Sequence, residues 1–199
     1  SYTYSKYSVL TNSATSALHI ACLALGLSEG DILWTSPNSY VASANVGLLC
    51  NAEVDFVDID SETYNMCSTA LSMKLRDAEK NGKLPKIVMP VHFAGQSCDM
   101  INIKKLSEKY GFKIIEDASH AIGGVYKNTK IGSCKFSDIT VFSFHPVKII
   151  TTAEGGCATT NDENIFEKLK LLSSHGVTRN PKNMVKKTLD KWVYDQISI

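Results

Sequence analysis

The chain has 199 residues, of which 44% are hydrophobic and 21% charged, as expected for one globular domain with a sizeable core. Because 21 Lys and Arg residues balance 20 Asp and Glu residues, its charge gives no reason to expect nucleic-acid or membrane-surface binding. No apolar run approaches the length of a bilayer span, the first residues lack a signal-peptide pattern, and the six scattered cysteines contain no CxxC pair. These features predict reduced buried thiols, no metal site and a cytoplasmic protein.

Strand-like and helix-like segments alternate along most of the chain. Strands are expected at 7–11, 32–35, 52–58, 86–92, 112–115, 139–144 and 155–160. Helices are expected at 12–26, 39–50, 68–80, 99–110 and 162–172, and the polar residues from His175 onward predict a loop. Short βα units of this kind predict a mostly parallel sheet that is covered by helices on both faces.

Lys148 carries the strongest functional signal. It ends the run Ser-Phe-His-Pro-Val-Lys, which overlaps the apolar strand 139–144, and Thr-Thr-Ala-Glu-Gly-Gly follows shortly after it. A lysine at the C-terminal end of a buried strand is desolvated, which makes its amine available as a nucleophile toward aldehydes. A lone lysine past a strand is more often a solvated surface group, but the surrounding residues favour the functional interpretation.

Asp117 follows the apolar strand 112–115 and is expected at the same edge of the sheet as Lys148, because ligands of parallel sheets bind beyond the carboxyl ends of the strands. Pyridoxal 5′-phosphate (PLP) needs such a pair: a Schiff-base lysine and a carboxylate that keeps the ring nitrogen protonated. Asp117 is also compatible with simple capping of the next turn.

Five further residues are candidates for cofactor contacts. Thr15 and Ser16 lie in the first turn of the first helix, where free N–H groups bind phosphate, although plain helix capping gives the same pattern. Ser143 is a further candidate for the phosphate, His120 for the phenolic oxygen of the cofactor and Tyr40 for stacking on its ring. For His120 and Tyr40, structural roles stay open. The sequence has no G-x-G-x-x-G after its first strand and no P-loop motif, so dinucleotide and NTP binding lose their main support.

Segments 12–18, 36–45, 90–96, 115–123 and 143–156 together resemble the DegT/DnrJ/EryC1/StrS sugar aminotransferases over nearly the whole chain. The resemblance implies an α/β fold: the three-layer αβα large domain of aspartate aminotransferase type I PLP-dependent transferases, with a mostly parallel seven-stranded sheet. It also implies site roles. Lys148 binds the cofactor covalently, and Asp117 pairs with the pyridinium nitrogen. The remaining contacts fall to His120 at the phenolic oxygen, Tyr40 on the ring, and Thr15, Ser16 and Ser143 at the phosphate.

The same resemblance implies amino transfer from L-glutamate to the 4-keto carbon of a nucleotide-linked 6-deoxy (N-acetyl) hexosulose. Segments 174–179 and 192–194 are most similar to the branch that acts on UDP-linked sugars in pseudaminic acid biosynthesis, a route to polysaccharides and flagellin glycosylation. A relative with histidine in place of this lysine is a dehydratase, so Lys148 favours transamination. A PLP-dependent sugar dehydratase or lyase is the alternative.

Residues 1–199 are expected to be the PLP-binding large domain, truncated at both ends and without the small C-terminal domain of the family. Family members are homodimers whose active site lies between two subunits, and their cross-subunit Asn-Tyr-Arg stretch would fall beyond Ile199. A catalytically silent truncated domain is therefore a further alternative.

Overall fold

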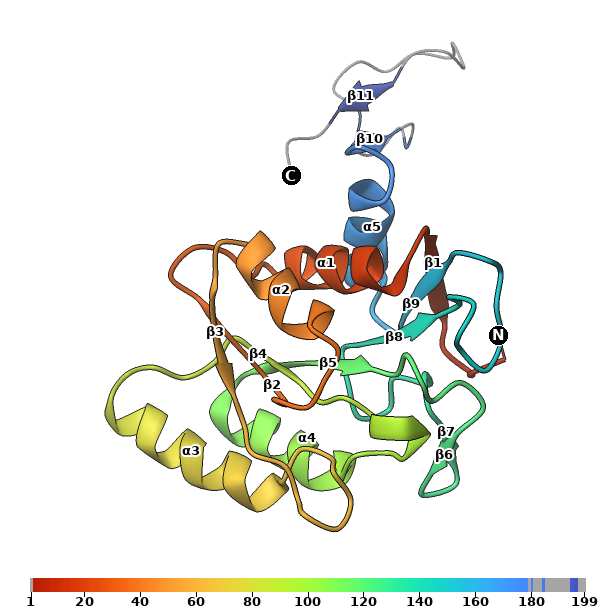
Figure 1. Cartoon of the computed structure of the whole chain (residues 1–199). Helices are drawn as coiled ribbons and strands as arrows, with labels where there is room; N and C mark the ends of the chain where they lie inside the picture. The colour runs from red at the N-terminus through yellow and green to blue at the C-terminus, as the bar shows by residue number, and fades with distance from the viewer. Residues whose placement is uncertain (1, 179, 181–183, 185–193, 197–199) are drawn as a thin grey trace.

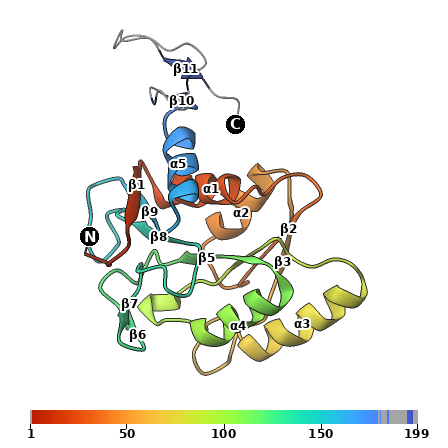
Figure 2. The same cartoon turned by 180° about the vertical axis from the view of Figure 1, so that it is seen from behind.

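The computed structural model describes residues 2–178, 180, 184 and 194–196. Arg179, Trp192 and Val193, on which part of the branch resemblance depends, lie outside these residues. Figures 1 and 2 show a central sheet between two layers of helices. None of the helices in the described part of the chain has the length and apolar character needed to cross a membrane.

The central sheet has seven strands in the order β1-β9-β8-β5-β4-β2-β3. The strands β3, β2, β4, β5 and β8 run parallel, whereas β9 pairs antiparallel with both β8 and β1. The mostly parallel seven-stranded sheet implied by the resemblance is thus confirmed. The strands span β1 (Tyr7–Thr11), β2 (Ile32–Thr35), β3 (Glu53–Phe56), β4 (Ile87–Met89), β5 (Lys113–Asp117), β8 (Ile139–Ser143) and β9 (Gly156–Thr160).

Helices cover both faces of the sheet, as predicted. One face is covered by α1 (Ala14–Ala24), α2 (Ala42–Leu49) and α5 (Glu163–Leu172), and the other by α3 (Ser68–Lys80) and α4 (Met100–Tyr110) (Figure 1).

The central strand β5 shows how the sequence builds both layers. Ile114 belongs to the core cluster with residues of α3 and α4, whereas Ile115 belongs to the cluster with residues of α1 and α2. Successive strand side chains point to opposite faces of the sheet. Glu116 therefore lies on the same face as Ile114, and Asp117 on the same face as Ile115. Two consecutive carboxylates on one strand therefore lie on opposite faces of the sheet.

The ends of the helices follow local capping chemistry. Ser13 Oγ accepts a hydrogen bond from the backbone N–H of Ser16 and starts α1. Asp99 caps α4 in the same way, and Gly111, with φ of 82°, ends that helix in the left-handed conformation that glycine adopts easily. The predicted starts of both helices are therefore correct to within two residues.

Several predicted boundaries were wrong. Helix α2 begins at Ala42 rather than at Ser39, because residues 36–41 form a loop at the mouth of β2. The strand predicted at 52–58 is shortened to β3, the edge strand, and Phe56 at its end is 44% exposed. Edge strands have only one neighbour to pair with, which explains why the pattern overestimated its length.

Other short elements have no counterpart in the sequence pattern. Residues 125–130 form a hairpin of β6 (Val125–Tyr126) and β7 (Thr129–Lys130), and Phe93–Gly95 forms the 3₁₀ helix η1. The loop predicted from His175 contains β10 (Val177–Thr178), which pairs with β11 (Asp195–Gln196). These pieces are too short for hydrophobic periodicity to detect.

Candidate active site

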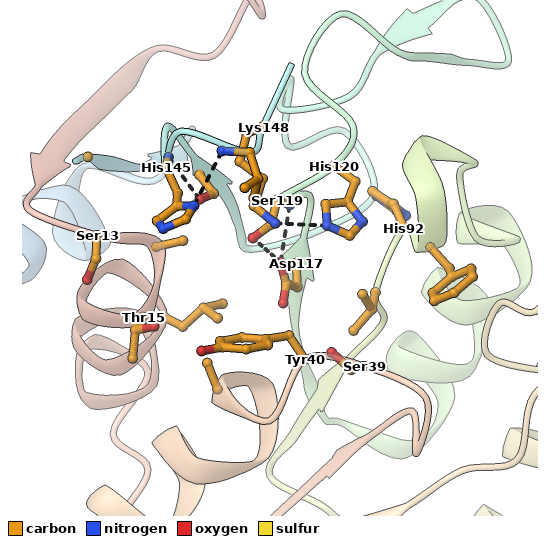
Figure 3. A pocket seen from close by; sticks show the side chains of 18 of the residues that line it. Ser13, Thr15, Ser39, Tyr40, His92, Asp117, Ser119, His120, His145 and Lys148 are labelled. Carbon is orange, nitrogen blue, oxygen red and sulfur yellow. Dashed lines mark hydrogen bonds between the residues drawn. The ribbon is translucent and has the colours of Figure 1, made fainter. Parts of the chain in front are cut away.

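A cavity of about 430 Å³ opens beyond the carboxyl ends of β5 and β8, beside the N-terminus of α1. Most of the predicted site residues line it: Ser143, and the five that Figure 3 labels, Thr15, Tyr40, Asp117, His120 and Lys148. Ser16 is not among the lining residues, and its hydroxyl donates to Asn12 Oδ1 at 2.6 Å. The fold therefore gathers in one pocket all but one of the side chains proposed from strand ends and helix starts.

Asp117 is the last residue of β5 and is only 4% exposed. Its Oδ2 accepts from the hydroxyl of Ser43 at 2.7 Å, and its Oδ1 accepts from the backbone N–H (3.1 Å) and hydroxyl (2.6 Å) of Ser119. The backbone N–H of Asp117 donates to Pro90 O at 2.9 Å, which ties the residue to the segment after β4. The carboxylate is thus held through both oxygens at the base of the pocket.

Lys148 reaches the pocket from a loop, not from a strand. Strand β8 ends at Ser143, and Lys148 lies in a turn closed by its own N–H and His145 O at 2.9 Å. Its side chain is half-buried, so the expectation of a lysine buried at a strand end was wrong. The run of apolar residues on β8 did locate the loop that carries it.

The Nζ of Lys148 lies 2.8 Å from Nε2 of His120 (Figure 3). Partial burial and the positive charge of Lys148 lower the pKa of His120, and the negative charge of Asp117 opposes this shift. A neutral imidazole can accept at Nε2, and an ammonium group can only donate. His120 therefore accepts a hydrogen bond from Lys148 and orients Nζ inside the pocket.

The N-terminus of α1 forms the end of the pocket that is suited to an anion. The first four N–H groups of a helix have no partner within the helix. Ser13 satisfies one of them, because its Oγ accepts from Ser16 N at 3.1 Å, and its carbonyl accepts the first intrahelical hydrogen bond, from Ala17 N, also at 3.1 Å. Among the described residues no acceptor contacts the N–H groups of Ala14 and Thr15. These two groups, together with the helix dipole, favour a bound phosphate.

Close packing of β9 on this turn completes the anion end. A Cβ on Gly156 would lie within 2.3–2.6 Å of backbone atoms of Ser13 and Ala14, so only glycine allows this approach. Gly156 pairs with Ser143 across the β8–β9 ladder. This register places Ser143 directly opposite the glycine that packs on the turn that begins α1.

Tyr40 lies on the opposite side of the pocket from Lys148 (Figure 3). This residue is 76% exposed. A tyrosine that served core packing would be largely buried. The exposed ring at the pocket wall therefore supports the stacking interpretation, which stays a prediction.

The sequence pattern does not assign a role to two serines that hold these groups, Ser43 and Ser119. Ser13, by contrast, had a recognisable signal as the capping residue of α1. Ser119, two residues after Asp117, completes a turn in which an aspartate binds its own downstream backbone. Turn capping and a role in the pocket are thus compatible for Asp117. Ser43 gave no signal, because a serine inside an apolar helix acquires a partner only through the fold.

Glu116 forms a second polar cluster on the other face of β5. His92 Nε2 lies 2.7 Å from Glu116 Oε2, and the N–H of Cys98 donates to His92 Nδ1 at 3.1 Å. Because Nδ1 accepts, Nε2 carries the proton and donates it to Glu116. Ser137 and Thr140 donate to Oε1. Burial raises the pKa of Glu116, but the hydrogen bonds, that from His92 above all, outweigh burial and lower it.

Known proteins match this chain in sequence and in structure. A transaminase from Campylobacter jejuni named for UDP-4-amino-4,6-dideoxy-N-acetyl-beta-L-altrosamine is 43% identical over 175 residues, which cover 87% of this chain and 44% of the relative. The aminotransferase PseC of Helicobacter pylori, described as involved in pseudaminic acid biosynthesis, superposes with a TM-score of 0.86 at 32% identity and covers all of this chain and 49% of that one.

A sugar aminotransferase of Streptococcus pneumoniae in its PLP form gives a TM-score of 0.81 at 30% identity, over 99% of this chain and 51% of that structure. The chain therefore spans about half the length of the proteins it matches. The sequence profile of the DegT/DnrJ/EryC1/StrS aminotransferases matches residues 1–191. The expected family is thus confirmed: this chain belongs to the DegT/DnrJ/EryC1/StrS aminotransferase family.

Proposed function

We propose that this chain is the PLP-binding large domain of a nucleotide-sugar aminotransferase. The observation that carries the proposal is the set of groups that share one pocket: the amine of Lys148, the carboxylate of Asp117, the exposed ring of Tyr40 and the open first turn of α1. They match in chemistry the aldehyde, the ring nitrogen, the ring face and the phosphate of PLP. The PLP form of the pneumococcal relative supports the same cofactor.

Bound PLP would supply an electron-withdrawing ring through which an amino group can be exchanged between two substrates. The chain's own residues do the rest. Lys148 holds the cofactor and moves protons at Nζ as general acid and base, with His120 orienting that atom. Asp117 holds the proton on the ring nitrogen. Thr15, Ser143 and the free N–H groups of α1 bind the phosphate, while Ser16 stabilises the turn by donating to Asn12.

For the substrate we propose a UDP-linked 4-keto-6-deoxy-N-acetylhexosamine with L-glutamate as amino donor, in pseudaminic acid biosynthesis and flagellin glycosylation. The name of the Campylobacter relative and that of PseC support this choice. A cytoplasmic location agrees with six free thiols, five of which are buried.

A homodimer is part of the same proposal. Three apolar side chains beside Lys148 face outward: Val147 is 77% exposed, Ile149 65% and Ile150 51%. Exposed apolar groups that gather at a pocket edge are typical of a surface that another chain covers. A second subunit at this edge would exclude water from the pocket.

The test is covalent trapping followed by an assay. PLP added to the protein and reduced with borohydride should label Lys148 in peptide mapping. Label on Lys127 or Lys135 instead would overturn the site. A panel of nucleotide 4-keto sugars should then give an amino sugar and 2-oxoglutarate from L-glutamate. Turnover without 2-oxoglutarate would indicate the dehydratase or lyase alternative, and the absence of any turnover would favour a silent domain.

A further inference from the structure

Ser43 is a fully buried polar residue in α2, whose other buried residues are apolar. Its hydroxyl lies 2.7 Å from Asp117 Oδ2 and 2.6 Å from the hydroxyl of Ser39. A buried hydroxyl without partners is costly, so a serine is tolerated here because the fold supplies partners on both sides. The contact also joins α2 to the end of β5, two elements that are distant in the sequence.

The direction of these hydrogen bonds is fixed by chemistry. A carboxylate oxygen only accepts, so Ser43 must donate its single proton to Asp117. Ser43 can then only accept from Ser39, which must donate. The result is a directional relay from Ser39, a half-buried residue that lines the pocket, through Ser43 to Asp117.

The relay complements the contacts of the other carboxylate oxygen. Oδ1 is held by the backbone N–H and hydroxyl of Ser119, so without Ser43 the carboxylate would be held at one oxygen only. Hydrogen bonds to a charged acceptor are stronger and more directional than neutral ones. Ser43 therefore controls the orientation that Asp117 presents to the pocket. Because Ser39 immediately precedes Tyr40, the relay also links that orientation to the loop that carries the exposed ring.

We propose that Ser43 is a positioning residue and that the Ser39–Ser43 relay sets the alignment of Asp117 against the ring nitrogen of the cofactor. The inference rests on the proposed function, because it assumes that PLP is the ligand. It assigns no direct cofactor contact to Ser43, which is fully buried and is not among the residues that line the pocket.

The test compares Ser43→Ala with a matched control, Ser107→Ala. Ser107 is also a buried serine in a helix, but its hydroxyl donates to Phe112 O at 2.6 Å, and its helix, α4, covers the opposite face of the sheet. Two quantities are measured in each variant and in the unmodified protein. The first is the Kd for PLP. The second is the absorption midpoint, the pH at which half of the bound cofactor has changed from the low-pH to the high-pH form of its visible absorption band.

Ser43→Ala should raise the Kd for PLP about tenfold, as expected for the loss of one hydrogen bond to a charged group. It should also move the absorption midpoint to higher pH, because a less firmly aligned carboxylate leaves less positive charge on the ring. Ser39→Ala, at a half-buried position, should shift both quantities in the same direction by less. Ser43→Thr keeps the hydroxyl and should restore the midpoint, and Ser107→Ala should leave both quantities unchanged.

If Ser43→Ala lowers the melting temperature as Ser107→Ala does but leaves Kd and midpoint unchanged, Ser43 is merely structural and the inference is overturned. It is overturned as well if Ser107→Ala shifts the midpoint equally. Failure of the unmodified protein to bind PLP at all would overturn the proposed function, and with it the inference. PLP binding that is insensitive to Ser43 would overturn the inference alone.

Discussion

Glu116 and Asp117 are consecutive acids on one strand, yet they belong to two different parts of the molecule. Asp117 faces α1 and α2 and borders a cavity of about 430 Å³, whereas Glu116 faces the α3–α4 layer and is enclosed by His92, Ser137 and Thr140. Both are nearly inaccessible to solvent, at 4% and 5% exposure. Burial alone therefore does not distinguish a functional carboxylate from a structural one.

What distinguishes the two acids is where their hydrogen-bond donors come from. His92 and Thr140, which donate to Glu116, are fully buried, Ser137 is half-buried, and the cavity beside Glu116 measures only about 10 Å³. The donors to Asp117 approach from α2 and from the turn after β5, and the pocket lies open in front of it. The comparison predicts that substitutions at Glu116 change stability, and substitutions at Asp117 and its pocket partners change chemistry.

The largest effect is expected on the pocket side, at Lys148. Lys148→Arg keeps the charge, but guanidinium stays protonated and cannot bond to an aldehyde. Transamination should fall about 10³-fold or more, since both the covalent anchor and the proton carrier are lost. Activity assays with borohydride trapping test this prediction: the variant should bind PLP without being labelled. Undiminished turnover in the variant would remove Lys148 from the chemistry.

The paired substitutions Asp117→Asn and Glu116→Gln test the comparison directly. Asp117→Asn should lower turnover about 10²-fold, as for other groups that stabilise charge in an active site, with little change in melting temperature. Glu116→Gln should lower the free energy of unfolding by about 2 kcal/mol and the melting temperature by about 4–8 °C, while turnover at 25 °C stays nearly unchanged. The reverse pattern would mean that the two carboxylates have been assigned to the wrong roles.

What the sequence predicted and what it missed differ in how far apart the interacting residues are along the chain. Apolar runs that end in polar residues predicted β5, β8 and the shared edge, because parallel strands end together. From these runs alone, Asp117 and the loop that carries Lys148 could be predicted to share one site. Sheet order and the antiparallel placement of β9 and β1 depend on pairing between residues up to about 150 positions apart, which local periodicity does not encode.

Residue roles were predictable only where the local chain defines the neighbours. Thr15 lies in the first turn of a helix, and a free N–H is guaranteed there by geometry. Ser16 lies in the same turn, but the direction of its hydroxyl depends on which acceptor is near. The hydroxyl donates to Asn12 Oδ1 at 2.6 Å instead of pointing into the pocket. The contact of Ser43 with Asp117 spans 74 residues and no local pattern signals it.

A smaller effect is expected from pH on the face opposite the pocket. Burial raises the pKa of Asp99, but hydrogen bonds from Asn102, Tyr126 and Ser68 outweigh it and lower the pKa. A carboxyl whose pKa is lowered by folding contributes stability above its unfolded pKa, and this contribution is lost as the pH falls through the folded value. Unfolding free energies between pH 6 and 3 should therefore fall more in the unmodified protein than in Asp99→Asn.

The difference at Asp99 should reach about 1 kcal/mol at most, the usual contribution of a helix cap. Asparagine also caps helices but does not titrate, so the two proteins should have similar stability near pH 6. Turnover near neutral pH should be equal in both, because Asp99 lies outside the pocket. A pH profile that is identical in the two proteins would show that Asp99 has no share in acid unfolding.

The smallest effect is expected at Ser119, within the pocket itself. Ser119→Ala removes the 2.6 Å hydroxyl contact with Asp117 Oδ1 but keeps the backbone N–H at 3.1 Å on the same oxygen. Since that oxygen retains a donor, the Kd for PLP should rise only about two- to threefold, equivalent to a weak hydrogen bond. Ser43→Ala, which leaves Oδ2 without its donor, should have the larger effect in the same titration. If Ser119→Ala raises the Kd for PLP more than Ser43→Ala does, the turn after β5, rather than α2, sets the orientation of Asp117.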